Sequence, residues 1–264
     1  MLNKINLEDI KKIAIEAGKA IMQIYAKDFQ IDYKDDKSPL TEADTKSNEI
    51  ICEALEILYP NIPILSEENK EVVYEDRKDW EYYWCIDPID GTKEFIKKND
   101  EFTVNIALIH KNTPVLGVVY ASAIDKMYIA KKDEGAYLND KKLPLEKEDD
   151  DFTVVASKSH LSNETQKFID DLKNKYSSLT TSSKGSSLKL CMVADGSADI
   201  YPRIAPTMEW DTAAAHAIVL ESGKNVYQYD ENISSTKYLD KNNIDLKPVV
   251  YNKEILLNPY FVVV

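Results

Sequence analysis

The sequence of 264 residues predicts a mixed α/β protein, and three observations support this fold class. The chain begins with two amphipathic helical patterns, at 7–26 and 44–58. A central stretch, 102–139, contains four strand-like runs with short connections, which is typical of a mostly antiparallel sheet. Beyond residue 151, helical and strand-like patterns alternate. A chain of this length forms one large domain or two closely packed halves.

The two N-terminal helices are predicted from apolar side chains that recur every three or four residues. Asn6 stands before the first helix, 7–26, where its side chain can cap the free amides. Pro60 follows the second helix, 44–58, and a proline at that position stops a helix. The apolar stripe of each helix is expected to face a core rather than a ligand.

Two short apolar runs after these helices lead directly into acidic residues. The run 62–66 precedes Glu67, and the run 82–86 precedes Asp87. Loops that follow the ends of buried strands are where α/β proteins place their chemistry. These acidic side chains are therefore expected to belong to a functional site.

The rest of the chain divides into a strand-rich centre and an alternating second half. Strands are predicted at 102–110, 114–122, 126–131 and 136–139. A charged stretch without periodicity, 141–151, is the candidate boundary. The second half is predicted to contain strands at 152–156, 198–201 and 260–264 and helices at 162–175, 186–195 and 211–222. Gly196 and Gly223 follow the last two helices, where a left-handed residue commonly closes a helix.

Composition excludes several classes of function. The formal net charge of −13 disfavours a nucleic-acid polymer as partner, because its phosphates would be repelled. Three cysteines without a CxxC pair and three scattered histidines give no basis for a disulfide framework or a zinc site. A small anionic substrate is compatible with this charge if bound cations supply the positive charge that its site needs.

No targeting segment is predicted. Apolar runs stay well below the ~18 residues of a membrane span. Residues 1–30 also lack the continuous apolar stretch of a signal peptide. We therefore expect a cytoplasmic protein without a membrane span.

Arginine is rare in this chain. Only Arg77 and Arg203 occur among 33 basic residues. Because the planar guanidinium fork makes paired hydrogen bonds that lysine cannot make, each arginine is a candidate for such a role.

The segment 87–92, with the sequence DPIDGT, concentrates groups that bind hard cations. Asp87 and Asp90 supply two carboxylates, and magnesium prefers oxygen ligands of this kind. Gly91 lets the backbone approach a ligand, and Thr92 is expected to start a short helix whose amides point toward an anion. The alternative is a solvated acidic turn. The pattern DPxDGT specifies five residues, each of which occurs at a given position with a probability of about one in twenty. A match by chance in a chain of this length is therefore rarer than about one in a thousand.

DPIDGT also resembles the signature of the inositol monophosphatase superfamily of lithium-sensitive phosphatases. Three further segments are similar to elements of that family and occur in its order: LTEAD at 40–44, LSEE at 65–68 and WDTAA at 210–214. The resemblance covers nearly the whole chain. It implies a layered αβαβα sandwich of the inositol monophosphatase and sugar phosphatase type, and sensitivity to lithium and calcium.

A more specific resemblance is to the bacterial 3′(2′),5′-bisphosphate nucleotidases of the CysQ type. It is carried by residues 91–96, 101–108, 156–160, 185–189, 201–203, 206–211 and 257–259. This resemblance implies hydrolysis of the 3′-phosphate of adenosine 3′,5′-bisphosphate, a by-product of sulfate assimilation, to give AMP. Departures are few, and the main one is Lys158, which stands where the family usually has arginine.

The family resemblance assigns two magnesium ions to named residues. Glu67, Asp87 and the carbonyl of Ile89 would hold the first ion. Asp87, Asp90 and Asp211 would hold the second, so that Asp87 bridges the two. A third ion during turnover is compatible with the same residues. For Asp211 the alternative role is that of a helix-capping residue.

The catalytic residues carried over from the family are Thr92, Asp44 and Glu67. Thr92 and Asp44 would orient and deprotonate the attacking water. Asp44 has an alternative role as a first-turn carboxylate that the helix dipole favours.

Substrate contacts are predicted chiefly around a loop-to-helix junction. Gly185, Ser186, Ser187 and Lys189 there suit the phosphate that is not cleaved, although an ordinary serine-capped helix start is the alternative. Arg203 could pair with a phosphate or with an internal carboxylate. The full set of predicted contacts is Glu67, Ile89, Asp90, Gly91, Thr92, Lys158, Gly185, Ser186, Ser187, Lys189, Arg203 and Asp211.

The sequence thus predicts a magnesium-dependent phosphatase with a small phosphorylated substrate, adenosine 3′,5′-bisphosphate. Residues 1–145 would form an α+β half with most metal ligands, and residues 146–264 an α/β half with Asp211 and the substrate contacts, in one compact unit. Two alternatives are an inositol monophosphatase or other small phosphomonoester phosphatase, and a non-catalytic metal-binding regulatory protein. The family resemblance also allows peripheral association with the inner membrane and leaves the oligomeric state open.

Overall fold

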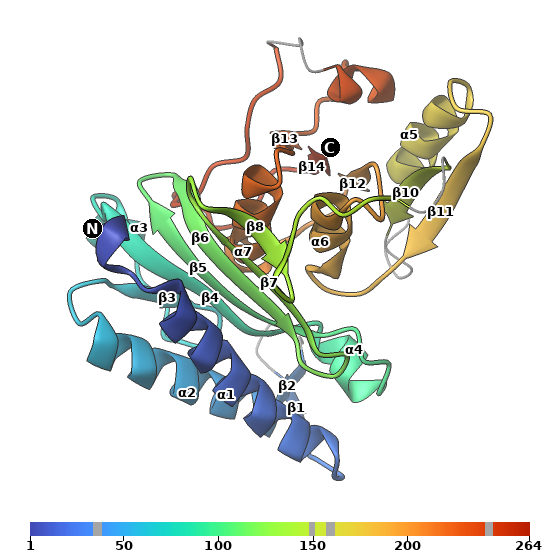
Figure 1. Cartoon of the computed structure of the whole chain (residues 1–264). Helices are drawn as coiled ribbons and strands as arrows, with labels where there is room; N and C mark the ends of the chain where they lie inside the picture. The colour runs from blue at the N-terminus through green and yellow to red at the C-terminus, as the bar shows by residue number, and fades with distance from the viewer. Residues whose placement is uncertain (34–38, 148–150, 157–161, 241–244) are drawn as a thin grey trace.

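A seven-stranded sheet forms the centre of the computed structural model, which describes residues 1–33, 39–147, 151–156, 162–240 and 245–264 (Figure 1). Its strands follow one another in chain order, β3 to β9, and every neighbouring pair is antiparallel except β3 and β4. The strands are β3 (Ile64–Ser66), β4 (Tyr82–Asp90), β5 (Thr103–His110), β6 (Thr113–Ala121), β7 (Lys126–Lys131), β8 (Gly135–Leu138) and β9 (Lys141–Lys142). The predicted, mostly antiparallel sheet is therefore confirmed.

Helices α1 (Leu7–Tyr25) and α2 (Glu42–Leu58) cover one face of this sheet, as Figure 1 shows. The side chain of Asn6 caps α1 by accepting a hydrogen bond from the amide of Glu8 at 3.1 Å. Helix α2 begins two residues before the predicted position because Thr41 and Asp44 form a reciprocal capping box. The apolar stripes of both helices are buried against the sheet, as the sequence predicted.

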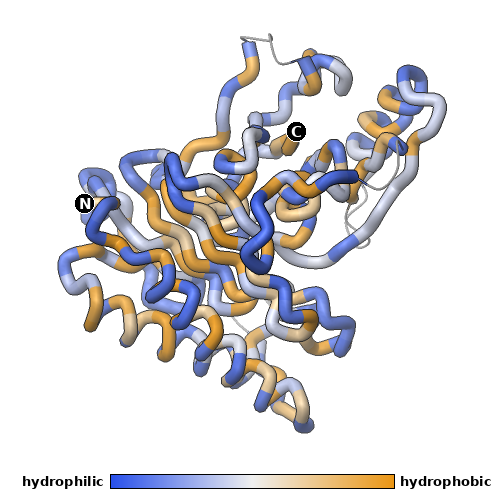
Figure 2. The backbone as a smooth tube through the Cα atoms, viewed as in Figure 1, coloured by the Kyte–Doolittle hydropathy of each residue, from blue (hydrophilic) through white to orange (hydrophobic). Residues whose placement is uncertain are grey.

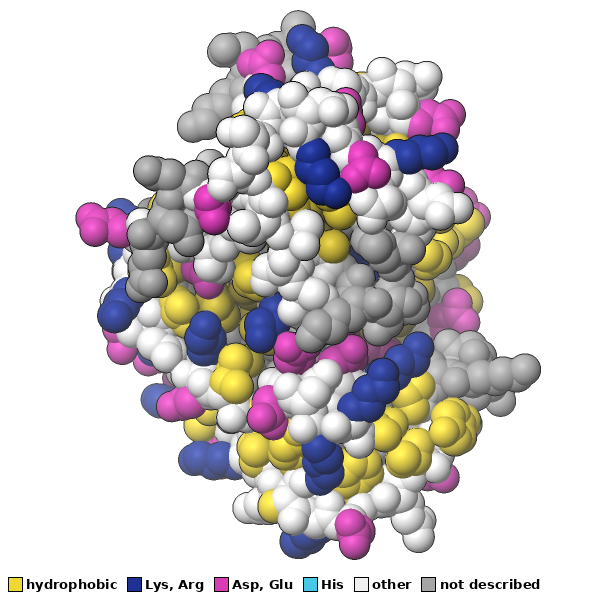
Figure 3. Space-filling model, turned by 90° about the vertical axis from the view of Figure 1, so that its right-hand side faces the viewer, with side chains coloured by type: hydrophobic (Ala, Val, Ile, Leu, Met, Phe, Trp, Pro, Cys, Tyr) yellow, Lys and Arg dark blue, Asp and Glu magenta, His cyan; other side chains and the backbone are white. Residues whose placement is uncertain are grey.

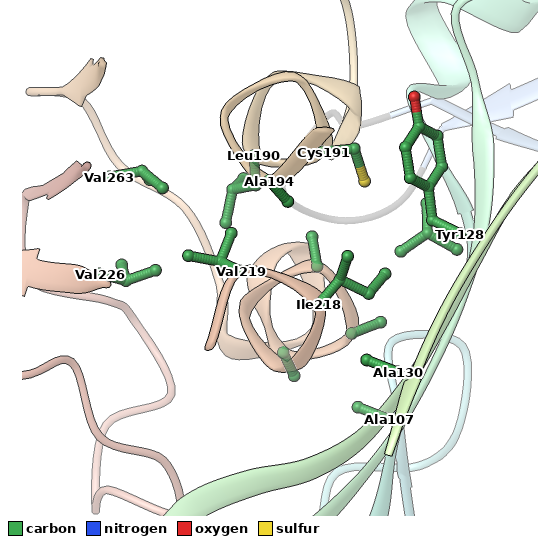
Figure 4. Packing of buried hydrophobic residues seen from close by; sticks show 14 of the residues in the cluster. Ala107, Tyr128, Ala130, Leu190, Cys191, Ala194, Ile218, Val219, Val226 and Val263 are labelled. Carbon is green, nitrogen blue, oxygen red and sulfur yellow. The ribbon is translucent and has the colours of Figure 1, made fainter. Parts of the chain in front are cut away.

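Helices α6 (Leu188–Asp195) and α7 (Glu209–Glu221) cover the other face. Figure 4 shows α7 between α6 and the sheet, with Val219 on the side of α6 and the small side chains Ala107 and Ala130 on the strands of the sheet. The strands of the sheet and helix α7 are predominantly hydrophobic in Figure 2 because they are covered on both sides. Helix α7 starts at Glu209 rather than at residue 211, so Asp211 lies inside its first turn.

A second β layer lies beyond α6 and α7. Strands β10 (Phe152–Ala156) and β11 (Leu179–Ser183) are parallel, and β14 (Phe261–Val263) pairs with both β12 (Tyr201–Arg203) and β13 (Val226–Gln228). A bridge between Val154 and Ile200 connects the two small sheets. Helix α5 (Asn163–Lys173) and the 3-10 helix η2 (Ser235–Leu239) pack outside this layer. The layers therefore follow the αβαβα order that the family resemblance implied.

Several elements differ from the sequence prediction. The strand predicted at 198–201 is observed at 201–203, and β1 (Ile31–Tyr33), β2 (Pro39–Thr41), β9, β11, β13 and α3 (Tyr74–Arg77) were not predicted. Strand β11 is polar and largely exposed, so it lacks the alternation by which a strand is identified. The remaining elements are η1 (Leu2–Lys4) and α4 (Thr92–Ile96). In the described parts of the chain, none of the helices combines the length and apolar character that a membrane crossing requires.

Candidate metal centre and substrate cleft

Strand β4 delivers the DPIDGT segment to the site. The strand continues to Asp90 instead of ending at residue 86, and its pairing with β5 shifts between Asp87 and Asp90. Irregularities of this kind re-aim side chains. Gly91 then adopts a φ of +95°, a conformation that favours glycine, and helix α4 begins at Thr92 as predicted.

Three carboxylates meet at the end of this strand. Glu67, Asp87 and Asp211 each place one carboxylate oxygen within 4.8 Å of the others, in the single such group found among the described residues. Glu67 follows β3, and its amide donates a hydrogen bond to the carbonyl of Ile86 at 3.1 Å. Asp87 lies on β4 and Asp211 in the first turn of α7. Three elements distant in sequence therefore converge on the carboxylate cluster.

Backbone amides hold two of these carboxylates in place. Asp87 Oδ1 accepts a hydrogen bond from the amide of Ile89 at 3.1 Å. Asp211 Oδ2 accepts one from the amide of Met208 at 2.8 Å. The capping role that the sequence offered as the alternative for Asp211 is thus present together with its place in the cluster.

The carboxylate cluster has the electrostatic character of a cation site. Burial raises the pKa of Asp87 well above its usual value, and the charges of Glu67, Asp90 and Asp211 raise it further. Burial and the neighbouring Asp90 likewise raise the pKa of Asp211. Like charges that are buried together disfavour ionisation unless a cation compensates them. An all-oxygen donor set of this kind fits magnesium, and it fits zinc poorly.

Asp90 lies at the edge of the carboxylate cluster rather than within the group of three. Burial raises the pKa of Asp90 to about 6, and the ammonium of Lys189 opposes this rise. Asp90 therefore lies between the carboxylate cluster and Lys189 of α6. Its predicted role as a metal ligand stays a prediction.

Thr92 and Asp44 form the hydroxyl–carboxylate pair that the family resemblance implied. Thr92 Oγ1 donates a hydrogen bond to Asp44 Oδ1 at 3.2 Å and lies 3.3 Å from the carbonyl of Ile89. The second oxygen of Asp44 accepts hydrogen bonds from the amide and the hydroxyl of Thr41, at 2.8 and 2.6 Å. Asp44 therefore caps α2 and also orients the threonine hydroxyl. Burial raises the pKa of the Asp44 carboxyl above its usual value.

A polar cleft of about 230 Å³ adjoins the carboxylate cluster, shares Asp211 with it and includes Asp90 at its edge. Figure 3 shows acidic and basic side chains side by side on the face that lies to the right in Figure 1. The cleft is lined by Asp90, Gly91, Lys93, Glu94, Lys97, Gly185, Ser186, Ser187, Lys189, Leu190, Tyr201, Arg203, Thr207, Asp211, Thr212 and Phe261. The predicted substrate residues of the second half therefore converge with Gly91 on one hollow, with the exception of Lys158, which lies outside the described residues.

Two basic side chains of this cleft are anchored by backbone carbonyls. Lys189 Nζ donates to the carbonyls of Ser186 and Lys184, at 2.6 and 3.2 Å, and burial lowers its pKa to about 8. Arg203 donates from one terminal nitrogen to the carbonyl of Pro206 at 2.9 Å. Its Nε is buried and makes no hydrogen bond to any described residue. The guanidinium of Arg203 therefore retains hydrogen-bonding capacity for a ligand.

The loop before α6 is pressed against the DPIDGT half of the molecule. A Cβ atom at Gly185 would lie 2.6 Å from the side chain of Glu94 and 2.8 Å from the carbonyl of Glu101, so only glycine fits there. The amide of Gly185 donates to the Glu101 carboxylate at 2.9 Å. Ser187 uses its hydroxyl to hydrogen-bond Asn105 of β5 at 3.0 Å. These contacts fix the position of the loop relative to the carboxylate cluster.

Sequence reasoning missed several residues at this site, among them Tyr201, Thr207 and Glu209. Tyr201 and Thr207 line the cleft, and Glu209 is buried two residues before Asp211. Tyr201 and Thr207 lie within segments that already carried the family resemblance, so their positions were available. Glu209 also lies in such a segment, 206–211, but an acidic residue in the first turn of a helix is ordinary and gave no separate signal.

A layered α/β fold with a partly buried carboxylate cluster beside a basic cleft defines the class of a metal-dependent phosphatase. The model of the inositol monophosphatase family matches residues 6–258, and the chain belongs to this family.

Individual relatives agree with this assignment. The chain is 45% identical over 235 residues to the 3′(2′),5′-bisphosphate nucleotidase CysQ of Salmonella typhimurium, covering 84% of this chain and 90% of the relative. It is 40% identical over 268 residues to the enzyme of the same name from Escherichia coli strain K12, covering 97% and 98%. The crystal structure of CysQ from Bacteroides thetaiotaomicron matches with a TM-score of 0.84 at 43% identity, covering 98% of this chain and 96% of that one.

Proposed function

We propose that this chain is a magnesium-dependent phosphatase that hydrolyses the 3′-phosphate of adenosine 3′,5′-bisphosphate to give AMP and inorganic phosphate. The observation that carries the proposal is the basic cleft that directly adjoins the carboxylate cluster. A substrate with two phosphates needs one place for the phosphate that reacts and a second, basic place for the phosphate that stays. The names of the curated relatives support the same substrate class.

Two magnesium ions would be held by Glu67, Asp87, Asp90, Asp211 and the carbonyl of Ile89. A third ion that joins during turnover is compatible with the same residues. When bound, magnesium activates a water and stabilises the charge that develops on the leaving oxygen. Three of these ligands, Glu67, Asp87 and Asp211, are already gathered, and Asp87 is buried, so little reorganisation would accompany cation binding at them.

The pair of Thr92 and Asp44 supplies the proton acceptor. The threonine hydroxyl donates to Asp44, which leaves the lone pairs of its oxygen to accept a hydrogen bond from water. As the water attacks phosphorus, its proton passes to Thr92 Oγ1 while the hydroxyl proton passes to the Asp44 carboxylate. The raised pKa of Asp44 makes this carboxylate a better acceptor than an exposed one.

The basic cleft holds the phosphate that is not cleaved. Lys189 and Arg203 provide the charge, and the close packing of Gly185 against Glu94 and Glu101 fixes the loop beside them. Because these groups are fixed by carbonyl contacts, they would select for a second phosphate at a defined distance from the first. We also propose a cytoplasmic location, since the three cysteines are free and two of them are buried.

The test is phosphate release from adenosine 3′,5′-bisphosphate and from inositol 1-phosphate, measured side by side with and without magnesium. The proposal expects magnesium-dependent turnover of the nucleotide at a kcat/KM at least about a hundredfold higher, with 5′-AMP identified by chromatography as the product. A preference for the inositol ester would refute the cleft assignment and retain the carboxylate cluster as the reactive centre. Release from neither substrate would favour a non-catalytic metal-binding protein.

A further inference from the structure

Glu209 is a fully buried carboxylate two residues before Asp211. Its two oxygens accept hydrogen bonds from the amides of Asn252 and Lys253, at 2.8 and 3.1 Å, and Oε1 also pairs with the ammonium of Lys253. The hydroxyl of Tyr83, on the strand that carries Asp87, lies 3.5 Å from Oε2. A buried charge is tolerated only when it is satisfied in this way. Glu209 is therefore tied to a short C-terminal segment and not to the substrate cleft.

Arg77 holds the same segment from the other side. It is 2% exposed, and its fork donates to the side chain of Asn252 at 2.8 Å and to the carbonyls of Lys253 and Glu254 at 2.7 and 2.8 Å. The side-chain amide of Asn252 donates a hydrogen bond to the backbone carbonyl of Arg77 at 2.8 Å. One of the two arginines in the chain is thus used for its planar geometry. The buried side chains of Arg77 and Glu209, which carry opposite charges, therefore both hydrogen-bond to the segment 252–254 and fix its position.

The residues that follow this segment reach the first turn of α7. The amide of Glu209 donates to the carbonyl of Leu256 at 2.9 Å, and the side chain of Asn258 donates to the carbonyl of Met208 at 2.7 Å. Met208 is the residue whose amide holds Asp211 Oδ2. The segment 252–258 therefore fixes both the start of α7 and the carboxylate that this start presents.

We propose that Glu209 and Arg77 are positioning residues for the cation centre, because together they clamp residues 252–258 onto the first turn of α7 and so aim Asp211 at the other carboxylates. Neither side chain lines the substrate cleft. Loss of the contacts of Glu209 or Arg77 with residues 252–258 should displace the first turn of α7 and weaken cation binding. The binding of the nucleotide's second phosphate should stay unchanged. The inference rests on the proposed cation centre and not on the identity of the substrate.

A purely structural role is the alternative, because any buried ion pair that loses one partner destabilises a fold. The two roles differ in what they change. A structural role lowers the melting temperature and leaves the cation affinity of the folded protein intact. A positioning role lowers the cation affinity of the folded protein, and excess cation restores turnover.

The experiment measures manganese binding to the full-length protein, without substrate, from the electron paramagnetic resonance signal of free Mn²⁺. The variants are Glu209→Gln, which removes the charge at constant shape, and Arg77→Lys, which keeps the charge and removes the fork. The matched control is Tyr128→Phe, which deletes the buried hydrogen bond of 2.9 Å to Asp195 at the far end of α6. Circular dichroism establishes that each variant is folded.

The proposal expects Mn²⁺ affinity about tenfold weaker in both variants, with kcat recovering to within threefold of the parent at saturating magnesium and the KM for the nucleotide within twofold. The control should bind Mn²⁺ within twofold of the parent. Folded variants with parental Mn²⁺ affinity would overturn the proposal, as would failure of both variants to fold at 20 °C. Loss of nucleotide turnover in the parent itself would instead contradict the proposed function and leave the Mn²⁺ result interpretable.

Discussion

Two walls of the site meet at Asp211 and carry opposite charge. The wall formed by β3, β4 and the first turn of α7 gathers carboxylates, and burial and the charges of neighbouring carboxylates raise the pKa values of Asp87 and Asp211. The wall formed by the start of α6 and strand β12 carries Lys189 and Arg203, each of which already donates to backbone carbonyls.

This difference in charge indicates that the carboxylate cluster requires a bound cation, whereas the basic cleft binds an anionic ligand. The negative charges of the carboxylate cluster are not compensated by basic side chains within the cluster, so a bound divalent cation would strongly favour the ionised carboxylates. The basic cleft is already held in shape by the chain, so a ligand adds contacts without much rearrangement. Changes to the first wall should therefore alter kcat and cation dependence, whereas changes to the second should alter KM.

The largest effect is expected for Asp87→Asn. This change removes the buried charge that all the other carboxylates face, and kcat at saturating magnesium should fall by about 10³ or more, as for loss of a main electrostatic element. Phosphate release with the nucleotide checks this. The control Asp170→Asn, on the exposed face of α5, should keep parental activity. An Asp87→Asn enzyme within tenfold of the parent would contradict the account.

Thr92→Ala should lower kcat by about a hundredfold, because it removes the proton acceptor that Asp44 orients, and a positioned acid–base group contributes about 10²–10⁴. Thr92→Ser retains a hydroxyl at the same place and should stay within tenfold of the parent. The comparison of the two variants at saturating magnesium is the measurement. Equal activity of the alanine and serine variants would show that the hydroxyl has no chemical role.

Lys189→Met should raise the KM for adenosine 3′,5′-bisphosphate by about tenfold to thirtyfold, the loss of one charge-assisted hydrogen bond, with kcat within threefold. The effect on inositol 1-phosphate should be smaller, because that ester has no second phosphate. Lys184→Met is the matched control, since Lys184 is more exposed and pairs with Glu101 outside the cleft. An equal rise in KM for both substrates would reject the assignment of the second phosphate to this cleft.

The smallest expected effect concerns stability in the absence of divalent cations. Burial raises the pKa of Asp90 from 3.8 to about 6, so the folded state binds this proton more tightly than the unfolded state does. The resulting stabilisation is present below the unfolded pKa and is lost as the pH rises through about 6. The melting temperature of the cation-free protein should therefore fall by about 2 °C or more between pH 5 and pH 7.5.

Calorimetry at the two pH values, with and without magnesium, checks this prediction. Magnesium should remove the fall, because it compensates the ionised carboxylates. The variant Asp90→Asn should reduce the fall in the cation-free protein. A melting temperature that rises with pH in the absence of cations would reverse the predicted sign.

Much of the fold was predictable because its elements have strong local patterns. The apolar stripes of α1 and α2 and the short runs of β5 to β8 follow helical and strand periodicity and were located within two residues. Strands β11 and β13 were missed since they are short and half-exposed, and they exist because a neighbouring strand pairs with them. Long-range pairing of this kind leaves little trace in local sequence.

The site divides in the same way. The meeting of Glu67, Asp87 and Asp211 was predicted from motifs, and the structure brings these three together. The contacts of Arg77 with residues 252–254 join positions about 175 residues apart, and no local pattern encodes them. Composition nevertheless gave a hint, because an arginine in a lysine-rich chain was expected to use its fork.

The most direct test of the two-walled site is an anomalous-scattering map from a crystal soaked with Mn²⁺ and AMP. The account predicts manganese peaks between Glu67, Asp87 and Asp211, and the phosphate of AMP in the cleft within hydrogen-bonding distance of Lys189 or Arg203. Manganese bound only at surface carboxylates, or a nucleotide phosphate outside that cleft, would contradict it.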